Sequence, residues 1–239
     1  MPKRLFAILL ICLFAQKLTA QSADTTLSPA VANAIHFYYQ SLKEESPLYN
    51  GSEYLEYSYM LQEGHPFYGS PEWTDAIVSF DGMIFHNVPL MYDIIKDQVV
   101  IRDFQKLFKI NLMAEKIDWF QVSGHTFVHL GRDSPHELRP GFYEQLFSGN
   151  ISLFARRQKK ILEKHIDVRI ENIVITQNTF LILKNAHYAF VKNKADLFHV
   201  LKDKKKEIQQ YLKKGHVKFK DGLEKAILIA VQHYDQLMK

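Results

Sequence analysis

The chain has a single cysteine, Cys12, which lies inside a hydrophobic run near the amino terminus. If that run is removed on export, no thiol remains, so disulfide bonds and a cysteine nucleophile are excluded from the mature protein. No later apolar stretch approaches the roughly 20 residues that cross a bilayer as a helix. The sequence therefore predicts no transmembrane segment in the mature chain.

The sequence also lacks the short motifs of common enzymes. It has no phosphate-binding loop, no dinucleotide fingerprint, no His-Glu-x-x-His pair and no Gly-x-Ser-x-Gly elbow. Of its 11 histidines, His125 and His129 would share one strand face. Four strand residues span about 13 Å, too far for both to bind one ion. We therefore expect no catalytic, cofactor-binding or metal-binding residue, and no cofactor.

The first 20 residues have the three parts of a secretory signal peptide. Two basic residues precede an apolar run at residues 5–15, and Ala20 supplies the small residue before a cleavage site. We expect residues 1–20 to be removed and residues 21–27 to form a flexible amino terminus. The predicted location is periplasmic or extracellular.

Charge is distributed unevenly along the remaining chain. Residues 44–103 contain 11 acidic and 2 basic side chains, whereas residues 156–220 contain 17 basic and 6 acidic ones. One interpretation is that the two segments attract each other within one fold. The other is a basic face that binds anionic lipid, acidic polysaccharide or an acidic protein surface. Nucleic acid is not expected as a partner, because the chain combines an export signal with no nucleic-acid-binding motif.

Apolar spacing predicts an α+β fold in one domain over residues 28–239. Helical spacing from 31 to 42 should end before Pro47. It returns near the carboxyl terminus, where Asn193 and Asp221 each begin a capping pattern. We therefore predict one N-terminal helix and two C-terminal helices, the latter packed on a sheet.

Between these helices, short apolar runs alternate with turn signals. Asp81-Gly82 is the strongest signal, because it suits a two-residue turn with positive φ at both positions. About nine to eleven strands are predicted, including a short one at 54–59. The other predicted turns lie at Lys96-Asp97, Ser123-Gly124-His125, Ser148-Gly149-Asn150, Gln177-Asn178 and Lys184-Asn185-Ala186.

Several strands are apolar on both faces, as at residues 90–95. One face is expected to pack on helices and the other on a curled part of the same sheet. Closure also removes exposed strand edges. The sequence therefore predicts a curved antiparallel β-meander or a partly closed barrel.

The segment at residues 48–73 combines aromatic side chains with Gly and Pro. Such side chains suit carbohydrate stacking or peptide recognition, and the alternative is a loop that plugs one end of the sheet. Nearby carboxylates match the composition of a site that cleaves glycans between two carboxylates. The alternative is that they serve a turn or are solvated. The aromatic residues are Tyr49, Tyr54, Tyr57, Tyr59, Phe67, Tyr68 and Trp73, and the carboxylates are Glu53, Glu56, Asp81 and Asp93.

Several short motifs give the chain a likeness to a known group of proteins. They are Leu48-Tyr49-Asn50-Gly51 with Tyr54, Phe80-Asp81-Gly82, Val88-Pro89-Leu90 with Tyr92-Asp93, Phe142-Tyr143 with Leu146-Phe147 and Gly149, and Asp203-Lys204-Lys205. Through these motifs the chain resembles a widespread family of exported bacterial envelope proteins of unknown function. The resemblance implies the envelope of a two-membrane bacterium, and it implies no active-site residue.

The leading functional hypothesis is an exported, non-enzymatic envelope protein that binds a hydrophobic ligand or a protein partner on a curved β-sheet. The first alternative is a hydrolase that acts on glycans through paired carboxylates. The second is a structural or assembly subunit that uses the basic C-terminal face. Candidate partners are thus a lipid, a glycan or an envelope protein, with peripheral membrane association as one form of binding.

Overall fold

The computed structural model describes residues 29–42, 45–131, 138–167 and 169–239. The predicted signal peptide and the flexible segment at 21–27 lie outside these ranges. The chain divides into two compact units, residues 1–41 and residues 42–239. Helix α2 (Pro29–Leu42) lies in the first unit apart from its last residue.

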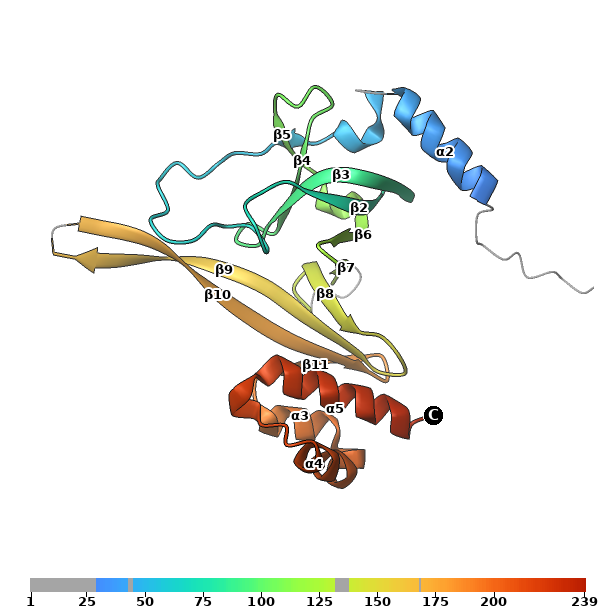
Figure 1. Cartoon of the computed structure of the whole chain (residues 1–239), viewed down its shortest axis with the longest axis vertical. Coiled ribbons are helices and arrows are strands. Elements are labelled where there is room, and N and C mark those ends of the chain that lie inside the picture. Colours follow the sequence, from blue (N-terminus) through green and yellow to red (C-terminus); the bar gives the residue numbers. More distant parts are fainter. Residues whose placement is uncertain (1–28, 43–44, 132–137, 168) are drawn as a thin grey trace, which may run out of the picture. The chain divides into compact units, whose positions relative to one another are not determined.

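The second unit is built around one antiparallel sheet of 11 strands (Figure 1). The strand order is β1-β5-β4-β3-β2-β6-β7-β8-β9-β10-β11, so the chain returns from β5 to pair β6 with the other side of β2. The strands are β1 (Ser52–Glu53), β2 (Thr74–Phe80), β3 (Met83–Asp93), β4 (Gln98–Arg102), β5 (Lys109–Asn111), β6 (Ile117–Val122), β7 (His125–Leu130), β8 (Gly141–Phe147), β9 (Ser152–Ile166), β10 (Arg169–Lys184) and β11 (His187–Val191).

The predicted partly closed barrel is wrong, because the sheet stays open with β1 and β11 as its two edges. Both edge strands are short, with two residues in β1 and five in β11. The interior of the curved sheet is filled by aromatic rings from four strands, with centroids 5.0 to 5.9 Å apart. These fully buried rings are Tyr92, Phe120, Phe127 and Phe142.

The predicted turns are mostly confirmed. Asp81 and Gly82 have φ values of 53° and 75°, and β2 pairs with β3 around them. Ser123 with Gly124, and Asn185 with Ala186, also have positive φ at both positions. These values match the twist that a two-residue hairpin turn requires.

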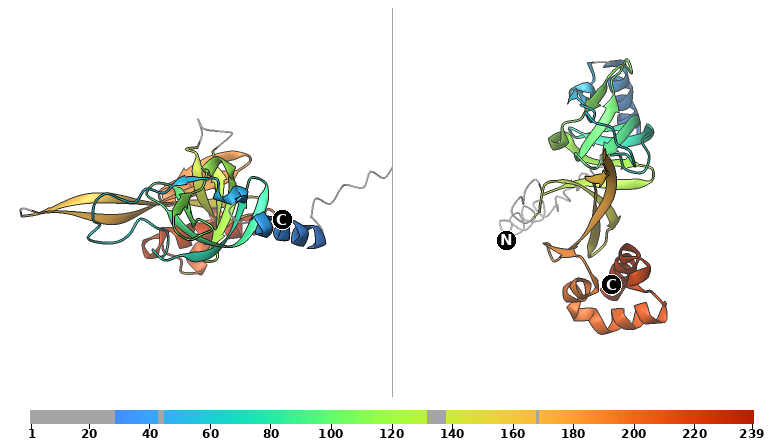
Figure 2. Two further views of the ribbon diagram at one scale, coloured as in Figure 1. Left: turned by 90° about the horizontal axis from the view of Figure 1, so that it is seen from above. Right: turned by 90° about the vertical axis from the view of Figure 1, so that its left-hand side faces the viewer.

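Two strand predictions are wrong. The short strand expected at 54–59 does not form, and β1 lies just before it at Ser52–Glu53. The turn expected at Gln177-Asn178 is also absent, since both residues pair with β9 inside β10. Continuous pairing of β10 with the long strand β9 overrides the local turn signal. The resulting β9–β10 hairpin extends beyond the neighbouring strands (Figures 1 and 2).

We predicted an N-terminal helix as part of this α+β fold. That prediction is wrong, because the α-helices in the unit that contains the sheet are C-terminal. In α2, the side chains of Val31, Phe37 and Tyr38 are exposed, and the buried apolar residues that the structure describes begin at Leu48.

The C-terminal region contains three α-helices rather than the two predicted. They are α3 (Lys194–Val200), α4 (Lys205–Lys214) and α5 (Leu223–Leu237). A 3-10 turn at Lys202–Lys204 interrupts the first predicted stripe. Asn193 caps α3 as expected, whereas Gly222 and not Asp221 precedes α5.

These helices pack on strands β8 to β11, as predicted, and form a hydrophobic core with them. Buried residues of both apolar stripes contact buried residues of the sheet. The helical members include Leu197, Leu201, Ile208, Leu212, Ile227, Ala230, Val231 and Tyr234, and the sheet contributes Ile151, Leu153, Ala155, Phe180, Ile182 and Val191.

Candidate functional site

The carboxylates expected to form a glycan-cleaving pair have separate partners in the structure. Asp93 is completely buried and accepts hydrogen bonds from the hydroxyls of Tyr54 and Tyr57. Burial and the charge of Asp93 raise the pKa of both tyrosines. Asp81 lies before the 11-residue strand β3, and Asp93 is the last residue of that strand. The Asp81 carboxylate pairs with Lys116 Nζ at 2.9 Å.

The other two carboxylates lie near the sheet edge. Glu56 pairs with Lys109, and Glu53 is exposed on β1. Glu56, Asp81 and Asp93 thus contact different partners, and these contacts give no support to the predicted pairing of carboxylates.

The aromatic segment at 48–73 packs mainly as a plug, which supports the second interpretation of it. Tyr54 is buried and its ring lies 6.3 Å from that of Phe67. Tyr68 meets the interior ring of Phe127 edge to face at 4.9 Å. Burial raises the pKa of Tyr68 to about 12. These rings contribute to the fold, although Tyr57 and Tyr59 also line a small groove of about 300 Å³.

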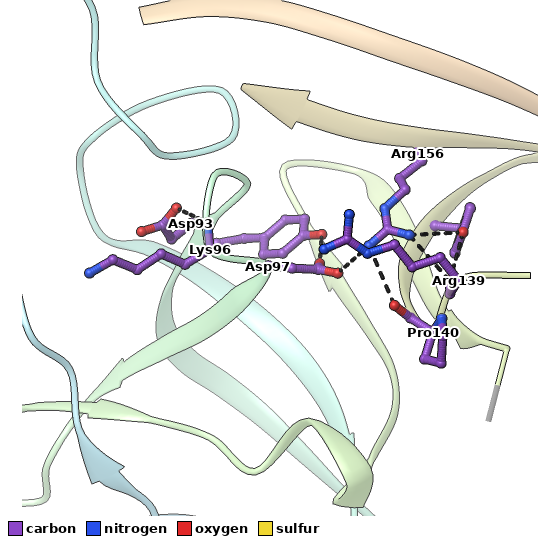
Figure 3. Close-up of polar contacts among 8 residues, drawn as sticks. Asp93, Lys96, Asp97, Arg139, Pro140 and Arg156 are labelled. Atoms are coloured by element: carbon purple, nitrogen blue, oxygen red, sulfur yellow. Dashed lines mark hydrogen bonds and ion pairs between the residues drawn. The ribbon is translucent and has the colours of Figure 1, made fainter. Parts of the chain in front are cut away.

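One buried cluster joins the acidic and basic segments of the chain. The Arg156 guanidinium donates to Asp97 at 3.0 Å, and Tyr92 donates to the second oxygen of the same carboxylate at 2.6 Å. The guanidinium also donates to the carbonyl of Arg139 and to the Tyr143 hydroxyl. Figure 3 shows Arg156 directed toward Asp97 and toward the Arg139 and Pro140 carbonyls. Because its polar groups satisfy one another, we assign this cluster to the fold.

A second cluster joins the sheet to the helices. Glu144 is buried, with one oxygen 2.5 Å from Nδ1 of His125 and the other accepting from Arg157. Arg157 also donates twice to Glu224 of α5, and these hydrogen bonds lower the pKa of Glu224. Both oxygens of Glu144 are therefore occupied, which leaves no free carboxylate for general-base chemistry there. This cluster was not predicted from the sequence, where its only visible signal is the Arg156-Arg157 pair directly after an apolar run.

A candidate site for a partner lies on the C-terminal helices. Two adjoining grooves of about 580 Å³ each share Lys194, Phe198 and Gln209. We call them together the lysine groove. Its apolar residues are Ala195, Phe198, Leu212, Val217 and Phe219, and its basic residues are Lys194, Lys202, Lys205, Lys213 and Lys218, with His199 and His216 beside them.

Helical spacing places these side chains along one face. On α4, Lys205, Gln209, Leu212 and Lys213 lie at positions i, i+4, i+7 and i+8. Leu212 is buried in the floor, whereas both lysines are exposed at the rim. A single helix thus supplies apolar contact and positive charge to the same groove.

Aromatic rings support the centre of the lysine groove. Phe198 and Phe219 meet edge to face with centroids 6.1 Å apart. Lys194 Nζ lies 5.8 Å from the centroid of Phe198 and 5.7 Å from that of Phe219. Cation–π attraction therefore favours this position of Lys194 over the floor.

Two acidic side chains of this helical region are directed to partners outside the groove. Asp196 accepts from the Lys192 amide, and Asp203 accepts from Lys184 and Tyr234. Among the described residues that line the lysine groove, none is acidic. Its positive charge is consequently not balanced within the groove.

Two other kinds of site are absent from the part of the chain that the structure describes. No group of three or more His, Cys, Asp or Glu side chains in the described ranges could hold a metal ion. Within those ranges, no helix combines the length and the apolar character needed to cross a membrane.

Comparisons with models of protein families, with curated proteins and with solved structures find no match to this chain. The class of the site therefore rests on its geometry, which is that of an open groove with an apolar floor and a cationic rim.

Proposed function

We propose that this protein is an exported, non-enzymatic envelope protein that binds an acidic, amphipathic segment of a partner protein in the lysine groove. Export is part of the proposal and rests on the signal-peptide pattern at residues 1–20. The observation that carries the binding role is the unbalanced row of lysines along an apolar floor. The curved sheet is less suited to a ligand, because aromatic rings fill its interior.

The distribution of charge favours a polypeptide over a fatty acyl ligand. Lys202 and Lys205 line only one of the adjoining grooves, Lys213 and Lys218 line only the other, and Lys194 lines both. A fatty acid carries its negative charge at one end. An amphipathic peptide can carry several carboxylates beside its apolar residues, and therefore matches positive charge along the full length.

The glycan hydrolase has less support. Three of its expected carboxylates, Glu56, Asp81 and Asp93, have separate partners, and Asp93 has no exposed surface from which to act on a substrate. The role of an assembly subunit agrees with the present proposal, since both use the basic C-terminal face.

The test is fluorescence anisotropy with a labelled synthetic peptide that alternates Glu with Leu and Phe. Lys205→Glu with Lys213→Glu changes two groove residues of α4, and Lys206→Glu with Lys214→Glu makes the same charge change outside the groove. We expect the groove pair to lose at least about tenfold in affinity, equivalent to about 1.4 kcal/mol, and the control pair to lose about twofold or less. An equal loss in both pairs would indicate general charge attraction and contradict the proposal.

A further inference from the structure

The turn between β4 and β5 exposes three large apolar side chains. Phe104, Leu107 and Phe108 are 44%, 69% and 62% exposed. Leu55 is 70% exposed, and it directly follows Tyr54, whose amide donates to the Lys109 carbonyl. Single exposed apolar residues are common on proteins, whereas three within five positions of one turn form a patch.

Hydrogen bonds give this turn a defined structure, in which the Phe104 ring also meets the Tyr49 ring edge to face at 6.1 Å. The Asp103 amide donates to the Phe108 carbonyl at 3.0 Å, and the Phe108 amide donates to the Asp103 carboxylate at 2.8 Å. The Lys106 amide donates to the Asp103 carbonyl, and Lys106 has φ of 62°. Asp103 is thereby used to close the turn, and its charge is directed toward the backbone.

Basic and aromatic groups flank the patch. Arg102 precedes it, with its guanidinium 4.8 Å from the centre of the Trp73 ring. Lys106 lies within the patch. Lys109 follows it, but its charge is paired with Glu56. Aromatic and aliphatic residues next to Lys and Arg are typical of segments that lie in a membrane interface, where rings enter the acyl boundary and cations meet lipid phosphates.

We propose that the β4–β5 turn docks on the surface of an anionic lipid bilayer. Phe104, Leu107 and Phe108 enter the headgroup boundary, and Arg102 and Lys106 contact phosphates. A protein partner is less suited, because three side chains on a projecting turn offer far less than the roughly 800 Å² per partner of a stable interface.

The turn and the lysine groove lie toward opposite edges of the sheet order, since β4 and β5 are near β1 whereas the helices pack on β8 to β11 (Figure 1). Membrane docking by the turn therefore does not depend on the proposed function of the groove. Together the two surfaces would allow one protein to hold a partner segment close to a membrane.

The experiment is vesicle co-sedimentation of the full protein with phosphatidylcholine vesicles, alone or mixed with phosphatidylglycerol. Leu107→Asn with Phe108→Asn removes the centre of the patch. Ile84→Asn with Ile170→Asn changes two residues of similar exposure elsewhere, at 52% and 55%. Each variant is prepared in the same way, so any contribution from residues outside the turn cancels in the comparison.

We expect binding to mixed vesicles to fall at least about tenfold in the turn variant and to change by about twofold or less in the control, since each inserted apolar side chain adds to partitioning. Lys106→Glu should weaken binding to mixed vesicles more than to neutral ones. Equal binding of the wild-type protein and the turn variant would overturn the proposal. It would also be overturned if sedimentation equilibrium showed that the turn variant converts a dimer to a monomer while vesicle binding is unchanged, because a second copy would then cover the patch.

Discussion

The guanidinium of Arg157 donates two hydrogen bonds to the carboxylate of Glu224, at 2.7 and 2.8 Å, and so links strand β9 to helix α5. The same guanidinium donates to Glu144, which is buried on β8. These ion pairs hold α5 against the sheet, and α5 packs in one core with α3 and α4, which line the lysine groove. The position of the groove thus depends on charges that do not line it.

Replacing Glu144 with Gln is expected to destabilise the protein by about 2–3 kcal/mol, because a buried acceptor shared by His125 and Arg157 loses its charge. The free energy of unfolding in urea measures this. Glu207→Gln is the control, since Glu207 is exposed and 4.0 Å from Lys204, and it should cost less than about 0.5 kcal/mol. Equal effects of the two changes would mean that the buried cluster does not hold the fold.

The Glu224 pair predicts a loss of stability in acid. Hydrogen bonds from Arg157 lower the pKa of folded Glu224 below its unfolded value of about 4.3. The pair therefore stabilises the fold above that value, and its contribution disappears as the pH falls through the lower, folded pKa. Unfolding free energies measured between neutral and acid pH should fall less steeply for Glu224→Gln than for the wild-type protein. Parallel pH profiles would contradict this assignment.

Gly141 lies against the Arg156–Asp97 cluster and has φ of 148°. A Cβ at this position would meet the Asp97 carboxylate and would lie 2.8 Å from Arg156 Nη2. Gly141→Ala should therefore cost about 2–4 kcal/mol, through both strain and a displaced ion pair. Gly82→Ala is the control, because Gly82 also has positive φ but an added methyl group there would have no atom within 4 Å, and it should cost about 1 kcal/mol. Thermal unfolding distinguishes the two.

Local signals in the sequence predicted most of the strands and the capped start of α3, because turn residues and apolar spacing act over a few positions. Asp81-Gly82 forms the turn that its two residues indicate. The open sheet, by contrast, depends on the chain returning after β5 so that β6 pairs with β2. No single residue determines that pairing. At Gln177 and Asn178 a turn signal was present, and pairing with β9 overrode it.

The candidate site was predictable in charge and not in shape. The excess of lysines after residue 156 indicated a basic C-terminal face. The floor could not be predicted, because Phe198 and Phe219 are brought together by the arrangement of α3 relative to the segment before α5. The sequence also could not show that Arg156 is buried in an ion pair while Lys205 remains exposed at the rim.

Salt should weaken binding of the acidic peptide without abolishing it. Attraction between exposed charges is screened over about 8 Å at physiological ionic strength, whereas burial against the apolar floor is not. We expect affinity to fall at least about tenfold from low to high salt for the wild-type protein. The slope should be shallower for Lys205→Glu with Lys213→Glu than for the Lys206 and Lys214 control. Identical slopes in these two variants would contradict a role for the groove lysines.

Peptide binding in the lysine groove is tested most sharply by an amide chemical-shift titration of the protein with the same Glu-rich amphipathic peptide. We expect saturable shifts at residues of the lysine groove, including Phe198, Gln209, Lys213 and Val217, with small changes in the sheet interior around Phe120. Shifts confined to other surfaces, or none at a peptide concentration that saturates the anisotropy signal, would show that the groove is not the binding site.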